Sequence, residues 1–119
     1  MAHLRQELAT ADAVMICSPE YAHSLPGTMK NLLDWTVGNA DLKRKPVAWI
    51  NIAQEGRGDG AQAQLATVLA YLDAAVVEPA CVRMTVTREH IDGDGRVSGE
   101  EPRSRLVAAL DALARHVRG

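Results

Sequence analysis

The chain has no phenylalanine, and aromatic residues make up only 3% of it. Apolar residues nevertheless account for 47% of the sequence. A core of this composition must be aliphatic, built from Leu, Val, Ile, Ala and Met rather than from aromatic rings. With 119 residues the chain is long enough for one small domain and too short for two. Every site must therefore share one core.

The chain also lacks an excess of positive charge and any long apolar run. Its 13 basic and 15 acidic side chains give a formal charge of -2, which argues against nucleic acid as a partner. No run reaches the roughly 20 apolar residues of a membrane span, so we expect no membrane insertion. The two cysteines, Cys17 and Cys81, lie in apolar runs without a signal peptide. We expect reduced, buried thiols in a cytoplasmic protein.

Apolar runs alternate with segments of helical periodicity along the whole chain. Uninterrupted runs predict strands that are covered on both faces at residues 13–17 and 47–52. A third strand is expected over residues 76–77 and 81–86, bent or delayed by Pro79. Helical spacing predicts helices at residues 2–10, 25–37, 61–72 and 106–117. The order (α)βαβαβα predicts an α/β fold with a parallel sheet and right-handed crossovers.

A polar loop, Ser-Pro-Glu-Tyr-Ala-His-Ser-Leu-Pro-Gly at residues 18–27, follows the first predicted strand directly. Ligands of open α/β sheets bind at the carboxyl ends of strands. Together with Ala-Asp-Ala-Val at residues 11–14 and Thr-Met-Lys-Asn-Leu-Leu-Asp-Trp at 28–35, this loop resembles the hallmark block of the NADPH-dependent FMN reductase family. The resemblance implies a flavodoxin-like fold, with FMN and NADPH as cofactors. It also implies hydride transfer from nicotinamide to a bound flavin and on to a small acceptor such as a quinone.

In that family the Pro-Glu-Tyr loop lies along the isoalloxazine ring, mainly through backbone groups. The resemblance therefore implies ring contacts for Pro19, Glu20, Tyr21 and Ala22. The family commonly has Asn-Gly where this chain has Ala22-His23, which removes a side-chain donor but not a backbone contact. The alternative is a plain strand-to-helix turn in which Pro26 starts the helix. That alternative explains the prolines but not Glu20-Tyr21.

A second loop, at residues 53–60, is glycine-rich and follows the second predicted strand. Glycines let backbone N–H groups approach a planar ligand or an anion closely. The family has a glycine-rich loop here that touches the flavin. The resemblance therefore implies cofactor contacts for Ala53, Gln54, Gly56, Arg57 and Gly58. For Arg57 two interpretations stay open, a contact with the phosphate of NADPH or simple solvation.

No catalytic side chain and no metal site are predicted. Hydride transfer to a flavin needs stacked rings and no protein base, because the cofactors carry the chemistry. His23 is either a proton donor to a reduced quinone or an ordinary surface residue. A phosphatase loop from Cys17 would need an arginine where His23 stands. A serine hydrolase would need a Gly-x-Ser-x-Gly elbow, which the sequence lacks.

A calcium loop is suggested by three acidic residues near the end of the chain, Asp92, Asp94 and Glu100. The pattern fails because Arg96 stands where a third ligand belongs and Val97 where glycine makes the turn. We therefore expect a solvated turn at this position.

The resemblance runs from about residue 4 to the C-terminus and begins at the helix before the family's third strand. The family's first strand, its Gly-Ser-x-Arg type phosphate loop, its first helix and its second strand then have no counterpart, a loss of at least ~30 residues. We expect a single partial domain over residues 1–119 with about three strands, and residues 13–17 at an edge that something should cover. Lost hydrogen bonds to the FMN phosphate would cost about 1.5–3 kcal/mol each. The competing interpretation is a non-catalytic remnant or assembly module that does not hold flavin.

The helix at residues 25–37 carries one large side chain off its apolar stripe. The stripe points to the sheet and consists of Leu25, Met29, Leu32, Leu33 and Thr36. At 100° per residue Trp35 projects away from it. Trp is favoured as an anchor in protein interfaces, and the reductases of this family associate through helices flanking the flavin loops. We expect a homodimer or tetramer that covers Trp35, the alternative being that Trp35 covers the rim of its own domain.

Overall fold

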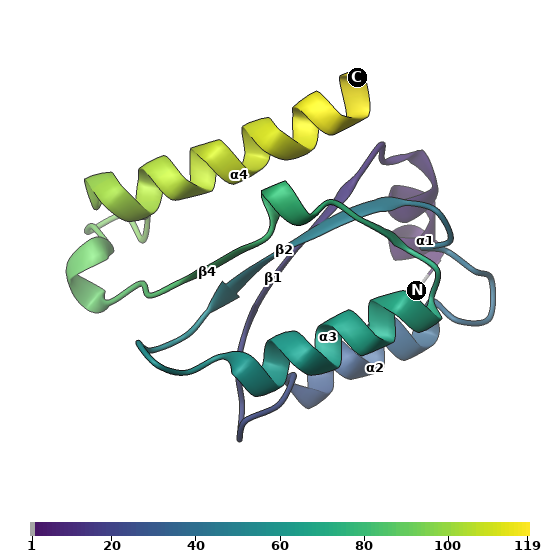
Figure 1. The fold of residues 1–119 in the computed structure, drawn as a ribbon, viewed down its shortest axis with the longest axis horizontal. Helices are drawn as coiled ribbons and strands as arrows, with labels where there is room; N and C mark the ends of the chain where they lie inside the picture. Colours follow the sequence, from purple (N-terminus) through teal and green to yellow (C-terminus); the bar gives the residue numbers. More distant parts are fainter. Residues whose placement is uncertain (1) are drawn as a thin grey trace.

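The computed structural model describes residues 2–119, and a parallel sheet with β2 in the middle organises it (Figure 1). Along one edge, β2 (Pro46–Ile52) pairs with β1 (Val14–Pro19), with Val14 opposite Val47 and Pro19 opposite Ile52. The other edge of β2 pairs with β3 (Ala75–Val76) and then with β4 (Val82–Met84). The sheet thus has three strand positions, and β1 lies at an edge of it, as predicted.

The third strand position is interrupted. Between β3 and β4 the chain makes one 3₁₀ turn, η1 (Glu78–Ala80), with Pro79 inside it. A proline has no N–H to offer the ladder, so the strand must leave the sheet and rejoin it. The predicted bend at Pro79 is confirmed. The strand ends earlier than predicted, at Met84, and residues 85–87 form a loop that leads into the 3₁₀ turn η2 (Arg88–His90).

Helices cover both faces of the sheet. The helices are α1 (Ala2–Thr10), α2 (Gly27–Trp35), α3 (Asp59–Tyr71) and α4 (Glu100–Arg118). Figure 1 shows α2 and α3 on one side of the sheet and α4 on the other. These elements and their order confirm the predicted α/β class. No helix within residues 2–119 has the length and apolar character to cross a membrane.

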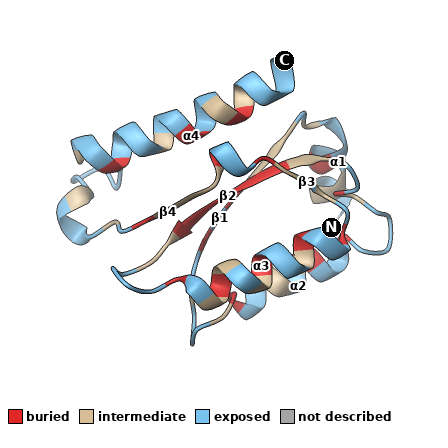
Figure 2. Cartoon of the chain, in the orientation of Figure 1, coloured by how far each residue is buried: buried red, intermediate tan, exposed pale blue. Residues whose placement is uncertain are grey.

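Two apolar clusters fill the spaces between the layers, and Figure 2 shows the buried residues concentrated along β2 and the inner helix faces. The larger cluster joins α1, α2 and α3 to the sheet through Leu8, Leu33, Leu69, Val47 and Trp49, among others. The smaller one joins α4 to the opposite face through Ala48, Val77, Ala80 and Leu113. The core is aliphatic as expected, apart from Trp49, which is 8% exposed.

The prediction that β1 is covered on both faces is only partly confirmed, because Met15 packs against the α4 cluster but Cys17 is exposed. Ile16 and Ser18 are buried, but Cys17 between them is exposed. Successive side chains of a strand point to opposite faces, and α4 packs over Ala48 of β2 and Ala80 of η1. The prediction of buried thiols is therefore wrong for Cys17. Cys81 is half-buried, and burial raises the pKa of its thiol.

Candidate functional site

Three loops meet at the carboxyl edge of the sheet and enclose a cleft of about 610 Å³. They follow β1, β2 and β4, as the geometry of parallel strands requires. Of the residues expected to contact the cofactor, the structure places Glu20, Ala22, Ala53, Gln54 and Arg57 in the lining of this cleft. Tyr21, Gly56 and Gly58 belong to the same loops, and Pro19 is the last residue of β1, but these four residues do not line the cleft. The two predicted loops are thus adjacent walls of one cleft.

The third wall, at residues 85–88, was not found from the sequence. Thr85, Thr87 and Arg88 line the cleft from this side. The third strand expected from the sequence runs to residue 86 and so includes residues 85 and 86 of this wall. Ligand sites lie at the carboxyl ends of parallel strands, and β4 ends at the same edge as β1 and β2. A predicted strand that ended at Met84 would therefore have identified this wall as well.

Glu20 joins the first wall to the second through the N-terminus of α3. Its carboxylate accepts hydrogen bonds from the N–H of Gly58 at 3.2 Å and of Ala61 at 3.0 Å. Only 8% of the Glu20 side chain is exposed. The Gly58 N-cap has no side chain of its own to satisfy the first turn of α3. Glu20 therefore caps a helix that lies about forty residues further along the chain.

The electrostatics of Glu20 reflect this capping role. The hydrogen bond from Ala61 is the main cause that holds the pKa of the Glu20 carboxyl below its ordinary value. The N–H of Gly58 and the neighbouring His23 act in the same direction, while burial opposes them. The ring Nδ1 of His23 lies 3.9 Å from the Glu20 carboxylate. At neutral pH Glu20 is thus an anion whose oxygens are already engaged by the protein.

Close packing and a second side chain hold the same two segments together. A Cβ added at Gly60 would lie 1.7 Å from the carbonyl oxygen of His23, so the first turn of α3 touches the backbone of the 20–26 loop. Gln64, one turn further along α3, accepts the N–H of Leu25 at 2.8 Å and the hydroxyl of Ser24. The Ala/Gln-rich start of α3 therefore positions the loop as well as forming a helix.

The loops after β2 and β4 are tied to the same turn of α3. The buried Asn51 of β2 donates from Nδ2 to the carbonyl of Gly58 at 3.0 Å. Arg83 of β4 contacts the carboxylate of Asp59 at 2.6 Å and donates to Gln62 Oε1 at 3.0 Å. Residues 58–64 are thus linked to the ends of all three strand positions.

Ala22 and His23 form the tip of the first wall in an unusual backbone conformation. Tyr21 and Ser24 exchange backbone hydrogen bonds of 2.9 Å each, and the residues between them have φ of 50° and 61°. This is the geometry of a type I′ turn, which favours Asn-Gly because both central residues are left-handed. Ala22 and His23 adopt this conformation at a steric cost, because both residues carry a Cβ atom.

The cleft offers backbone donors to a flat ligand. The N–H groups of Ala22 and Gln54 have no hydrogen-bond partner among residues 2–119, and both residues line the cleft. An isoalloxazine ring presents carbonyl oxygens and ring nitrogens that accept such bonds. The volume of the cleft also lies within the range of small-molecule sites. The cleft is therefore large enough for a flat small-molecule ligand.

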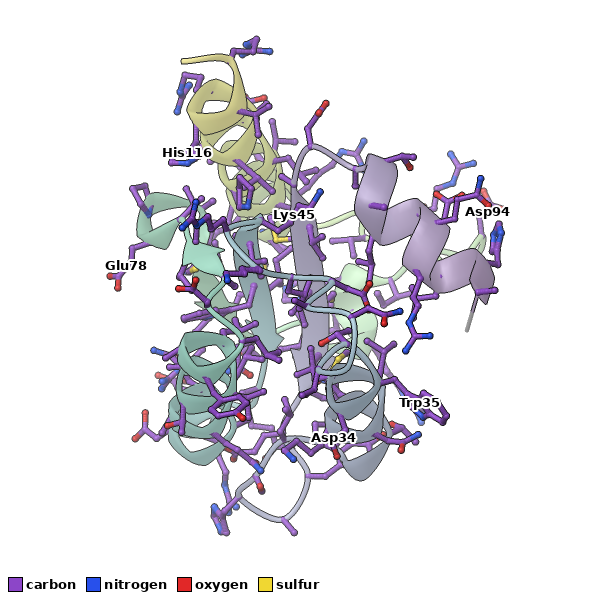
Figure 3. The ribbon with its side chains drawn as sticks, turned by 90° about the vertical axis from the view of Figure 1, so that its right-hand side faces the viewer. Asp34, Trp35, Lys45, Glu78, Asp94 and His116 are labelled. Atoms are coloured by element: carbon purple, nitrogen blue, oxygen red, sulfur yellow. The ribbon has the colours of Figure 1, made fainter. Side chains whose placement is uncertain are left out.

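The acidic segment near the end of the chain behaves as a turn. Asp92 Oδ1 accepts the N–H groups of Asp94 at 2.9 Å and of Arg96 at 3.0 Å, and these residues are exposed. Figure 3 shows Asp94 at the outer surface of the molecule. The solvated turn expected here is confirmed.

Comparison with known proteins finds both a matching family and similar individual proteins. Residues 1–87 match the family described as NADPH-dependent FMN reductase. The chain is 34% identical over 118 residues to a 2-hydroxy-1,4-benzoquinone reductase of Burkholderia sp, and 30% identical over 118 residues to an NAD(P)H-dependent FMN reductase of Pseudomonas aeruginosa. The matches cover 96% of this chain, but only 64% and 63% of these relatives. The chain thus spans less than two thirds of the length of either relative.

A solved structure has the same fold. The flavoenzyme NAD(P)H:acceptor oxidoreductase FerB from Paracoccus denitrificans superposes with a TM-score of 0.84 at 27% identity. The superposition covers 98% of this chain and 66% of that one. A flavodoxin from the domain Archaea superposes with a TM-score of 0.71 at 16% identity over 97% of this chain, so the fold is flavodoxin-like, as expected from the sequence.

Replacing Glu20 by Gln should lower the urea midpoint of unfolding at neutral pH, because a neutral amide caps α3 less strongly than a carboxylate. The pKa of this group is lowered on folding, so its stabilisation is present above the ordinary value of 4.5. It is lost as the pH falls through the lowered value. Wild type and variant should therefore converge in acid. Glu55→Gln, in the neighbouring loop, is the control and should change the urea midpoint neither at neutral nor at acid pH. Equal midpoints for Glu20→Gln and wild type at neutral pH would refute the capping role.

Replacing Ala22-His23 by Asn-Gly should stabilise the fold by about 1 kcal/mol, because it relieves left-handed strain at two non-glycine residues. Urea unfolding measures the change. Ala40→Gly is a matched control with a φ of 53° outside the cleft, and it should give a gain of the same sign. A less stable double variant would show that the Ala22 and His23 side chains contribute more than the strain costs.

Proposed function

Because this chain belongs to the NADPH-dependent FMN reductase family, we propose that it takes part in NAD(P)H-dependent reduction of FMN or of a quinone. The isoalloxazine ring would occupy the cleft between the loops after β1 and β2. The observation that carries the proposal is the convergence of both ring-contact loops on one cleft of about 610 Å³. The names of the relatives from Burkholderia and Pseudomonas support it, since one reduces a benzoquinone and the other FMN.

The residues of the chain have binding and positioning roles in this proposal. A bound flavin would supply the hydride acceptor and pass the electrons to the final acceptor. The N–H groups of Ala22 and Gln54 would hold the ring by its acceptors, and Glu20 would fix the separation of the two walls that carry them. No side chain needs to transfer a proton for hydride to move between stacked rings.

The competing function is an assembly module that does not hold flavin. It is favoured by the extent of the match, because the chain spans only 64% of the length of its Burkholderia relative. It is opposed by the cleft, which is lined by all three loops and by two residues whose backbone N–H groups have no partner within residues 2–119. We further propose a cytoplasmic location, which fits two cysteines that are both free.

The flavin proposal predicts that purified chain quenches the fluorescence of added FMN with saturable binding. Gly60→Ala should weaken this binding about tenfold or more, because a methyl group there collides with the His23 carbonyl and moves the first wall. Gly27→Ala is the matched control, since a Cβ at that position meets nothing within 4 Å. The rate of NADPH oxidation with a quinone should likewise fall in Gly60→Ala and stay unchanged in Gly27→Ala. Chain that takes up no FMN would favour the assembly module.

We also propose that the chain forms a homodimer or tetramer through the face of α2 that carries Trp35. The buried Leu25, Leu33 and Thr36 confirm the predicted stripe, while Trp35 remains 51% exposed. In Figure 3 its ring projects outward beside α1, where Arg5 donates to the Trp35 carbonyl at 3.1 Å. Val37 next to it is also exposed. An indole of this size in water favours burial against another chain.

Trp35→Ala should therefore reduce the mass of the assembly measured by light scattering at micromolar concentration. Tyr71→Ala, which removes a ring that is 79% exposed at the end of α3, is the control and should leave the mass unchanged. A monomeric wild type, together with unchanged mass and stability for Trp35→Ala, would remove the proposal.

A further inference from the structure

The N-terminus of α3 is closed to a nucleotide phosphate. A helix N-terminus beside a strand end commonly binds phosphate through its free N–H groups. Here the N–H groups of Gly58 and Ala61 already donate to Glu20, whose carboxylate occupies the anion position itself. The phosphates of a dinucleotide that enters the cleft must therefore be held by other groups.

Two arginines from different walls line the cleft. Arg57 belongs to the loop after β2, and Arg88 begins the 3₁₀ turn η2 (Arg88–His90) after β4. Among residues 2–119, neither guanidinium has a hydrogen-bond or ion-pair partner. Arg83 and Arg105, which lie close by on β4 and α4, are by contrast engaged with Asp59 and with a backbone carbonyl. Arg57 and Arg88 are therefore two exposed arginines that lie in the cleft lining and are not engaged by the described residues.

The charge of the cleft is opposite to that of the chain. The whole sequence carries a formal charge of -2, but the cleft is lined by two guanidinium groups and one carboxylate. That carboxylate, Glu20, is engaged by the protein. His23 is the remaining titratable group in the lining, and it also faces Glu20. The field within the cleft therefore favours an anion, and guanidinium groups match phosphate in charge and geometry.

We propose that Arg57 and Arg88, from the loops after the neighbouring strands β2 and β4, form a phosphate-binding pair for the nicotinamide dinucleotide. This inference rests on the proposed function, because it takes the electron donor to be a nicotinamide nucleotide. The pyrophosphate and the 2′-phosphate share the chemistry that the pair recognises. Binding to the pair would place the nicotinamide end of the molecule toward the ring walls formed by the loops after β1 and β2.

Calorimetric titration of the full chain with NADP⁺ and with NAD⁺ tests the pair without any turnover. Arg57→Gln and Arg88→Gln should each weaken NADP⁺ binding about tenfold, the loss expected for one charge-assisted hydrogen bond, and should reduce its salt dependence. Arg96→Gln is the matched control, because Arg96 is exposed in the 92–96 turn and does not line the cleft. An equal loss for NAD⁺ assigns the pair to the pyrophosphate, and a loss confined to NADP⁺ assigns it to the 2′-phosphate.

Three results would overturn the pair. The first is that NADP⁺ binds both variants as tightly as the wild type. The second is that Arg96→Gln weakens NADP⁺ binding equally, which would indicate only the electrostatic field of the whole protein. The variants could also weaken FMN relative to riboflavin while leaving NADP⁺ unchanged, which would assign the arginines to the flavin phosphate. The titrations are made with and without FMN. Failure to bind FMN would therefore refute the proposed function, whereas the NADP⁺ titration would still test whether Arg57 and Arg88 bind phosphate.

Discussion

The carboxylate of Glu20 at the N-terminus of α3 is the interaction on which the geometry of the cleft depends. Parallel strands deliver their loops to one edge of the sheet, but the sheet alone does not fix how far apart those loops stand. Glu20 sets that separation for the first two walls by bonding to the backbone of Gly58 and Ala61. Asn51 and Arg83 bring the second and third strand positions to the same turn. One helical turn thereby serves as the common reference for the site.

The residues of the Pro-Glu-Tyr loop therefore have different roles. Glu20 lines the cleft, but its carboxylate oxygens are bonded to the backbone of Gly58 and Ala61, so its main part is to position its neighbours. The neighbours that line the cleft are Ala22 and His23, at a tip whose backbone is left-handed at both residues. Non-glycine residues persist in that conformation only where the surroundings impose it. The reciprocal Tyr21–Ser24 bonds and the Gln64 contact with Leu25 supply those surroundings.

The sequence was sufficient for the features that local periodicity and strand polarity determine. The helix expected at residues 2–10 lies at Ala2–Thr10, and the Pro79 interruption lies at η1, because both follow from local chemistry. The exposure of Cys17 could not be derived, since periodicity shows that a strand is apolar but not which face another element reaches. The capping by Glu20 was equally hidden, because it joins residues about forty positions apart. Arg88 was missed because the end of β4 was placed two residues too late.

The two kinds of contact that a nucleotide makes are separated in this structure. In the proposed function, contacts with the flavin ring would come from walls that are held together by bonds within residues 2–119. The helix N-terminus that such folds commonly offer to phosphate is filled by the same carboxylate that holds the walls. The interaction that builds the ring site therefore removes one phosphate site, and binding of anions falls to side chains around the cleft. Arg57 and Arg88 lie among these side chains. The same Glu20 carboxylate thus stabilises the site and restricts where an anionic ligand can bind.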